Sequence, residues 1–144
     1  MQRKSLADQD CPIAQTLDLV GEWWSLLILR DAFRGIRRFE TFQESLGVAR
    51  NILSRRLTRL VAAGILERRR YSERPVREEY RLTDKGRDLF PVIIALLEWG
   101  NRWGAATPQR LLDRATGALV EPVLVDATTL RRLSPRELRL AARG

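Results

Sequence analysis

Residues 37–82 decide the fold and read RRFETFQESLGVARNILSRRLTRLVAAGILERRRYSERPVREEYRL. Apolar residues at helical spacing predict two short helices, Phe39–Leu46 and Arg50–Ala63, and Gly47 supplies the turn between them. In the second helix the apolar positions form a single stripe, so one face is expected to be buried and the other exposed. That stripe consists of Leu53, Leu57, Leu60 and Val61.

A strand hairpin is expected directly after these helices. Ile65–Tyr71 and Glu78–Leu82 have strand character, and the loop Ser72–Arg77 between them contains Pro75, which suits a turn and not a central strand position. A helix-turn-helix followed by a two-stranded wing is a shape that places one helix in a DNA major groove.

Positive charge is concentrated on the same stretch. From Arg30 to Arg87 there are 16 Lys or Arg and 8 Asp or Glu, an excess of +8, while the rest of the chain holds 10 of each. The whole excess charge therefore lies on the expected DNA-reading element, as contact with phosphates requires. The alternative is a winged-helix module that binds protein, in which the arginines only solvate the surface.

Composition excludes several other functions. The chain has no histidine and one cysteine, which removes the commonest general base, the Cys-cluster zinc sites and any intrachain disulfide. With no phosphate-binding glycine loop either, an enzyme is not expected, and neither is a metal or a cofactor. No apolar run is long enough to span a bilayer and no signal segment opens the chain, so we expect a cytoplasmic protein.

Two further helices are expected before this stretch. Cys11-Pro12 opens the first, which ends at Gly21, and the second covers Trp23–Phe33 and is apolar nearly all round, which predicts a central buried helix. Ile36–Arg38 is expected to add a short strand to the wing.

After the hairpin, Thr83 is expected to cap one long helix that runs to Trp103 and kinks at Pro91. Beyond it, Leu119–Val125 suggests one or two short strands broken by a proline, and Ser134 with Glu137 suggests a final helical turn. No sequence repeat is evident.

The expected fold class is α+β and mainly helical: a winged helix-turn-helix with flanking N-terminal and long C-terminal dimerisation helices. The chain divides into a mobile N-terminus (1–10), a DNA-binding and dimerisation domain (11–106) and a C-terminal extension with short strands (107–144).

The candidate DNA contacts lie on the second helix of the motif and on the wing. If the leucine stripe faces inward, the polar side chains of that helix face outward, and Arg and Asn can read guanine and adenine by paired hydrogen bonds. Wing arginines commonly meet phosphate or the minor groove. The set is Arg50, Asn51, Ser54, Arg55, Arg59, Arg74 and Arg77.

Two other features suggest assembly and sensing. Trp99 and Trp103 lie four residues apart on the C-terminal helix, whose apolar excess favours a homodimer; Leu17 and Leu96 are expected at the same interface. Cys11 precedes a helix N-terminus, where the helix dipole favours the reactive thiolate, although it can equally be an indifferent cap.

Several motifs, spread over residues 11–103, resemble the HxlR-type family of bacterial winged-helix transcriptional regulators, a branch near the MarR type. They are Cys11-Pro12-Ile13, residues 21–31 (GEWWSLLILRD), Leu53–Leu57 (LSRRL), residues 77–83 (REEYRLT) and Trp99-Gly100 with Trp103.

This resemblance implies a homodimer that binds a palindromic operator in double-stranded DNA as a repressor or an activator. Several members sense oxidants or electrophiles through the cysteine of the Cys-Pro motif, and a small-molecule effector is the other possible signal. The chain departs from the family where Ala49 replaces a serine at the start of the recognition helix. Its tail also resembles a cysteine-bearing ribbon of some relatives, with Asp126 and Thr128 but no cysteine, so the metal site of that ribbon is absent.

Overall fold

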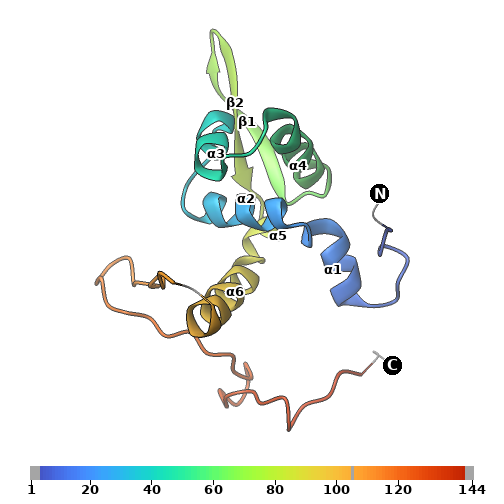
Figure 1. Cartoon of the computed structure of the whole chain (residues 1–144), viewed down its shortest axis with the longest axis vertical. Coiled ribbons are helices and arrows are strands. Elements are labelled where there is room, and N and C mark those ends of the chain that lie inside the picture. The colour runs from blue at the N-terminus through green and yellow to red at the C-terminus, as the bar shows by residue number, and fades with distance from the viewer. Residues whose placement is uncertain (1–3, 105, 142–144) are drawn as a thin grey trace. The chain divides into compact units, whose positions relative to one another are not determined.

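The helix-turn-helix and its wing form at the expected place in the chain. The protein is seen here in a computed structural model, which describes residues 4–104 and 106–141 and divides by internal contacts into two units, 1–95 and 96–144. Within the described residues, the elements are α1 (Pro12–Val20), α2 (Trp23–Phe33), α3 (Phe39–Leu46), α4 (Arg50–Ala62), β1 (Leu66–Glu73), β2 (Val76–Leu82), α5 (Asp84–Arg87) and α6 (Phe90–Trp103). The winged helix-turn-helix of mainly helical α+β class is confirmed (Figure 1).

The core of the first unit lies between α2, α3, α4 and the base of the hairpin. Its buried side chains come from each of these elements, so that no single helix could form it alone. The leucine stripe of α4 is buried as predicted, except that Val61 is only partly covered. The buried apolar residues of the cluster are Val20, Ile28, Leu29, Phe42, Val48, Leu53, Leu57, Leu60, Ile65 and Leu66.

Helix α2 is central but not buried on all sides. Ile28 and Leu29 are fully buried, whereas Trp23 is 71% exposed at the start of the helix. The prediction of a helix covered nearly all round was wrong at Trp23, because this side chain lies away from the core, whereas Trp24 in the same turn packs against it. Glu22 caps this turn: its carboxylate accepts hydrogen bonds from the backbone N–H groups of Trp24 and Ser25, each at 3.0 Å.

The hairpin is longer than the sequence predicted. Pairing begins at Leu66 and Leu82 and continues to Glu73 and Val76, so the connection shrinks to Arg74-Pro75. A register shift between Arg70 and Ser72 twists the outer half of the ribbon. The hairpin projects beyond α3 and α4 (Figure 1).

Residues 36–38 do not form the expected third strand. The backbone N–H of Tyr80 donates to the carbonyl of Arg37 at 2.7 Å, and no further ladder bond is made among the described residues of this segment. This single hydrogen bond holds the segment beside β2. Pairing goes no further because α3 begins at Phe39 and turns the chain away.

The single long helix expected after Thr83 is instead two helices. Thr83 does act as an N-cap, with its hydroxyl accepting from the N–H of Gly86 at 3.1 Å, but α5 ends at Arg87 and α6 starts at Phe90. The break precedes Pro91 because proline has no N–H to donate to the carbonyl four residues earlier. A proline is tolerated in the first turn of α6, where that donor is not needed.

Hydrogen bonds join the turn after α4 to the turn after β2. Thr83 donates its backbone N–H to the carbonyl of Ile65 at 3.1 Å, and its hydroxyl also contacts that carbonyl at 3.1 Å. Gly86 packs against the same atom so closely that a Cβ there would lie 2.2 Å from the Ile65 oxygen. Two segments distant in sequence therefore meet through a backbone contact that only glycine permits.

The tail contains a tandem repeat that the sequence analysis missed. Residues 111–122 read LLDRATGALVEP and residues 124–135 read LVDATTLRRLSP, with Asp, Thr and Pro at matching positions. Each copy forms a tight turn closed by one isolated bridge, Leu112 with Leu119 and Val125 with Arg132. The strands expected at Leu119–Val125 and the final helical turn at Ser134 are absent from the described residues, where short turns take their place.

Both turns are held by the same side-chain network. One carboxylate oxygen of Asp113 accepts from the N–H of Ala115 and from the N–H and hydroxyl of Thr116 at 2.8–3.0 Å. Asp126 repeats this arrangement in the second copy with the N–H of Thr128 and the N–H and hydroxyl of Thr129. The residue after each threonine has a positive φ, 71° at Gly117 and 57° at Leu130.

These bonds lower the pKa of both aspartates below the ordinary value of 3.8. For Asp113 the largest cause is the backbone N–H of Thr116, followed by the Thr116 hydroxyl and the N–H of Ala115. For Asp126 the causes are the N–H groups of Thr129 and Thr128, then the Thr129 hydroxyl. The charged carboxylate is therefore what closes each turn.

No helix in the part of the chain that the structure describes combines the length and the apolar character needed to cross a membrane.

Replacing Gly86 by alanine is expected to destabilise the first unit by at least ~2 kcal/mol, because the new Cβ would overlap the Ile65 carbonyl. Urea unfolding measures this loss. Gly100→Ala is the matched control, since a Cβ at that position would have no neighbouring atom within 4 Å and alanine favours a helix interior. Equal stability of the two variants would contradict the packing argument.

The tail turns are expected to open in acid. Because the folded-state pKa of Asp113 is depressed, its stabilising contribution is present above the unfolded value of 3.8 and is lost as pH falls through the lower folded pKa. The amide proton shift of Thr116, followed by NMR during acid titration, reports the opening. In Asp113→Ala this titration should vanish while that of Thr129 persists, because Asp126 holds the second turn; loss of both signals would contradict independent turns.

Candidate nucleic-acid interface

The outward face of α4 presents uncommitted polar side chains. Burial of Leu53, Leu57 and Leu60 sets the rotation of the helix, so that Asn51, Ser54 and Arg55 are exposed. Among the residues that the structure describes, these three side chains form no hydrogen bond, ion pair or ring contact. Their donors and acceptors are thus available to base edges.

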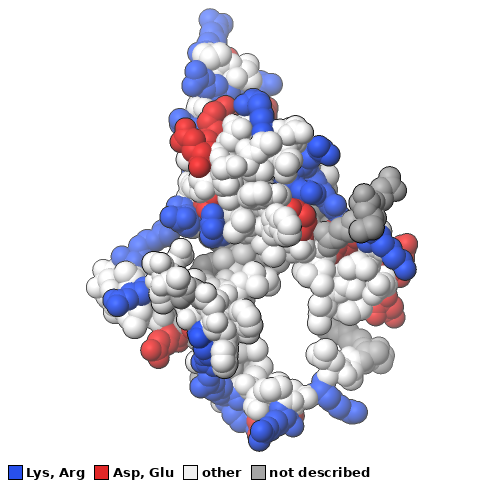
Figure 2. Space-filling view, viewed as in Figure 1, with Lys and Arg blue, Asp and Glu red and all other residues white. Residues whose placement is uncertain are grey.

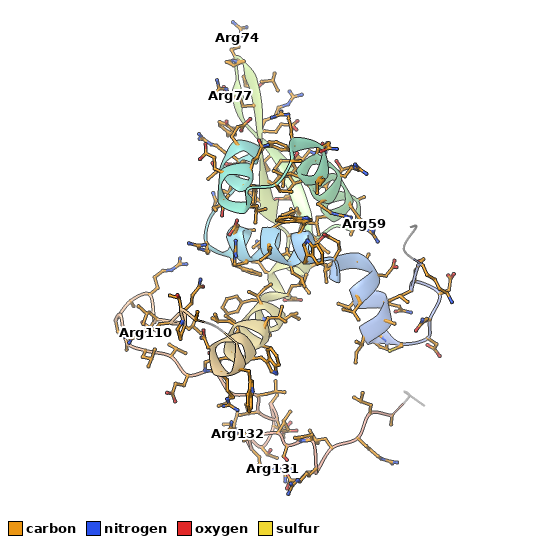
Figure 3. All side chains as sticks on the ribbon, viewed as in Figure 1. Arg59, Arg74, Arg77, Arg110, Arg131 and Arg132 are labelled. Carbon is orange, nitrogen blue, oxygen red and sulfur yellow. The ribbon has the colours of Figure 1, made fainter. Side chains whose placement is uncertain are left out.

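Two arginines of the same helix are instead committed to the protein. Arg56 lies 3.1 Å from the carboxylate of Glu22, the residue that caps α2. Arg59 donates to the backbone carbonyl of Asp18, and its guanidinium lies 3.7 Å from the Asp18 carboxylate (Figure 3). These contacts tie α4 to the end of α1 and the start of α2, and so fix how the outward face is presented.

Asp18 and Glu22 are thus positioning residues that the sequence analysis missed. An acidic residue at a helix start is a recognisable cap signal, so Glu22 could have been anticipated. Asp18 carries no such signal, because its role depends on where α1 ends relative to α4.

The start of α4 has no side-chain cap, as expected from Ala49. Arg50 follows it and lies over the ring of Phe39, with the guanidinium carbon 4.6 Å from the ring centroid. This cation–π contact joins the two helices of the motif and holds the Arg50 donors at the start of α4.

The tip of the wing carries two unpaired arginines. Arg74 and Arg77 are exposed and point away from the hairpin (Figure 3), and neither side chain has a partner within the described residues. Basic side chains cover this tip in the space-filling view (Figure 2). The tip can therefore contact phosphates without first breaking an ion pair.

The arginine triplet of β1 divides between the two faces of the ribbon, as the strand period requires. Arg68 reaches Thr58 of α4 at 3.4 Å and lies over the Tyr80 ring, whereas Arg69 pairs with Glu67 at 3.0 Å. Arg70 forms neither kind of contact within the described chain. Part of the basic charge is thus structural.

Cys11 is the N-cap residue of α1, partly exposed, and its side chain makes no capping hydrogen bond. The described part of the N-terminal segment bonds back to α1: the N–H of Leu6 donates to the carboxylate of Asp18 at 2.8 Å. Residues 1–3 of the segment expected to be mobile lie outside the described residues.

The four residues expected at a dimer interface are all exposed in the single chain. The exposed fractions are 45% for Leu17, 52% for Leu96, 69% for Trp99 and 70% for Trp103. Leu96, Trp99 and Trp103 recur at three- to four-residue spacing on α6, so they share one apolar face of that helix, which a partner could cover.

No group of three or more metal-ligating residues comes together in the part of the chain that the structure describes.

Comparison with known proteins identifies the family. The model of the HxlR-like helix-turn-helix matches residues 19–108, which cover α2 to α6 and therefore the outward face of α4 and the wing. The chain belongs to the HxlR-like helix-turn-helix family.

Relatives of this HxlR-like protein are regulators. The HTH-type transcriptional regulator Rv3095 of Mycobacterium tuberculosis is 41% identical over 131 residues, 85% of this chain and 83% of its own. The crystal structure of PA1607, described as a transcription factor, is 40% identical and matches 97% of this chain and 100% of that one with a TM-score of 0.88. The redox regulator HypR in its reduced form is 33% identical, with a TM-score of 0.60 over 65% of this chain and 95% of its own.

The HxlR-like chain is thus a transcriptional regulator with a helix-turn-helix domain and not an enzyme. The likeness to PA1607 extends over the tail, well beyond the part matched by the family model.

Proposed function

We propose that this regulator binds a palindromic operator as a homodimer and represses transcription from it. The observation that carries the proposal is the pairing of an uncommitted polar face on α4 with an uncommitted basic tip on the wing. A helix in the major groove and a wing on the flanking backbone use both surfaces at once.

The two surfaces have different tasks in this proposal. Asn51, Ser54 and Arg55 read base edges, because their hydrogen-bonding groups are exposed and unpaired. Arg74 and Arg77 neutralise phosphates and add affinity without sequence preference. Double-stranded DNA is thus the principal partner.

Arg50 and Arg59 are less free to contact DNA, because each side chain also contacts another part of the protein. Arg50 is held over Phe39 and offers its donors at the start of α4, and Arg59 offers to phosphate only the donors that Asp18 does not use. Both therefore orient α4 as well as contact DNA.

A homodimer explains the exposed apolar side chains Leu17, Leu96, Trp99 and Trp103. Two linked recognition helices bind two half-sites with an affinity that a single copy cannot reach, which matches the two-fold symmetry of a palindrome.

A signal is expected to enter through Cys11. It is the one cysteine of the chain, it is partly exposed, and it stands at the start of α1, which reaches α4 through the contact of Asp18 with Arg59. The relative HypR, a redox regulator with both a reduced and an oxidised structure, supports this role.

DNA binding distinguishes the reading residues from the positioning ones. Arg55→Ala is expected to cost about 1–3 kcal/mol on the operator and to relax specificity at one base pair. Arg74→Ala should weaken all sequences alike and reduce the slope of log K against log salt by about one. Mobility shifts with a fragment from upstream of the gene, against random DNA, measure both effects.

Arg70→Ala is the control for the wing, because it removes an arginine of β1 that lies away from the wing tip. If Arg55→Ala and Arg74→Ala lose equal affinity on operator and on random DNA, the assignment of tasks is wrong. If the unmodified protein binds no DNA at low salt, the chain is a protein-interaction module instead.

Trp103→Asp is expected to convert the protein to a monomer, because a charge would replace an aromatic anchor at the interface. Light scattering after size exclusion measures the mass against 16.6 kDa for one chain. Arg114→Asp, a charge change on an exposed tail turn, is the control and should leave the dimer intact. An unmodified protein with monomer mass would exclude the dimer.

Alkylation of Cys11 with iodoacetamide or its oxidation with peroxide is expected to change operator affinity, since the modified side chain alters the start of α1. Operator binding before and after treatment measures the response. Cys11→Ser should bind operator normally and respond to neither reagent; identical binding by treated and untreated protein would leave Cys11 a simple helix cap.

A further inference from the structure

A pocket of about 580 Å³ opens on the first unit, at the base of the wing and away from its tip. It lies on the sheet face opposite α4, because Arg68 reaches α4 from one face of β1 while Glu67 and Arg69, which line the pocket, belong to the other. The volume falls within the range of pockets that hold small organic ligands.

The pocket walls combine an apolar side with an excess of arginine. Ala32 and Ile36 supply apolar surface, and Tyr80 and Leu82 of β2 also belong to the lining. The charged lining residues are Arg37, Arg69, Arg81, Arg87, Glu67 and Asp84, so four cations face two anions and the net charge is +2.

Three of these arginines are already paired. Arg69 lies 3.0 Å from Glu67, and Arg81 lies 2.6 Å from Glu79, a buried carboxylate behind the lining. Arg87 donates to the carbonyl of Leu82 at 2.8 Å and pairs with Asp84. Counting Glu79, the charge around the pocket is +1.

Arg37 carries that remaining charge. Its side chain is exposed and forms no hydrogen bond, ion pair or ring contact within residues 4–104 and 106–141. Its backbone, however, is held in place by the bond from the N–H of Tyr80 at 2.7 Å. The pocket thus has a guanidinium on a fixed backbone, with all its donors unused, in a largely polar lining that also contains apolar residues such as Ala32 and Ile36.

We propose that this pocket binds a small organic carboxylate with an apolar body. The Arg37 guanidinium would take the carboxylate by two parallel hydrogen bonds, and the apolar walls would cover the body of the ligand. A bare inorganic anion would leave those walls unused, and a neutral ligand would leave Arg37 unpaired.

A ligand in the pocket would lie close to the residues that hold the DNA-reading motif. Its effect on DNA binding rests on the proposed function. Arg37 precedes Arg38, which is the N-cap residue of α3 and lies over the ring of Tyr71 on the wing at 4.4 Å. A ligand that moves Arg37 therefore acts on the first helix of the motif and on the wing together. The carboxylate is in this sense an effector of the regulator.

Binding of 2-naphthoate to the DNA-free protein, measured by calorimetry, tests the site. A Kd on the order of 1 mM or tighter is expected for a ligand of about 13 heavy atoms. Arg37→Gln should weaken it about tenfold or more, since a charge-assisted pair is lost. Arg70→Gln removes the same charge from β1 outside the pocket lining and should bind normally.

The neutral 2-naphthamide should bind at least about tenfold more weakly than 2-naphthoate. Equal binding of acid and amide, equal binding by Arg37→Gln and the unmodified protein, or no binding at all would overturn the site. If Arg37→Gln binds naphthoate normally but loses DNA affinity, Arg37 is a phosphate contact and the proposal is wrong.

Mobility shifts with saturating 2-naphthoate test the regulatory step separately. A change in operator affinity that Arg37→Gln abolishes is expected. Ligand binding with unchanged operator affinity overturns the effector role, while failure of the protein to bind DNA at all refutes the proposed function and leaves the calorimetric result for the pocket standing.

Discussion

The rotational setting of α4 is the constraint on which the rest of the structure depends. Leu53, Leu57 and Leu60 are buried together, and turning the helix by one residue would expose a leucine and bury a polar group. Burial energy of ~1.5–3 kcal/mol for each such side chain makes that rotation unfavourable. The outward position of Asn51 and Arg55 therefore follows from packing on the opposite face.

The arginines of this regulator divide by partner and not by position in the sequence. Arg56 and Arg59 lie on the same helix as Arg55, yet they bind Glu22 and Asp18 and so join α4 to α1 and α2. Solvent still reaches the arginine side of each pair and screens the attraction, so the value of these contacts lies mainly in orientation. Uncommitted arginines remain where a ligand can reach them, at Arg55 on α4, at the wing tip and at Arg37.

The tail is ordered by local hydrogen bonds and not by burial of apolar side chains. It buries few side chains, and each turn instead satisfies its backbone N–H groups with one aspartate oxygen and a threonine hydroxyl. The repeat of this device in two adjacent segments shows that a short stretch of chain suffices for it. The structure of PA1607 matches 97% of the chain, so a comparable tail is present in that protein as well.

The sequence by itself determined the elements whose signals are local. The bounds of α2 and α3 were predicted to the residue, because apolar periodicity and flanking glycines act within a few positions. The family was recognisable from sequence motifs such as residues 21–31 and 77–83, whereas the assignment of α4 as the DNA-reading helix stays a prediction. The sequence also predicted Thr83 as a cap. It could not show that a new helix begins at Phe90, just before Pro91, because that depends on which carbonyl would otherwise lack a donor. Tertiary structure alone decided which arginines are paired, why position 86 requires glycine, and that Arg37 stands unpaired beside a pocket, because each depends on atoms brought together from segments far apart in the chain.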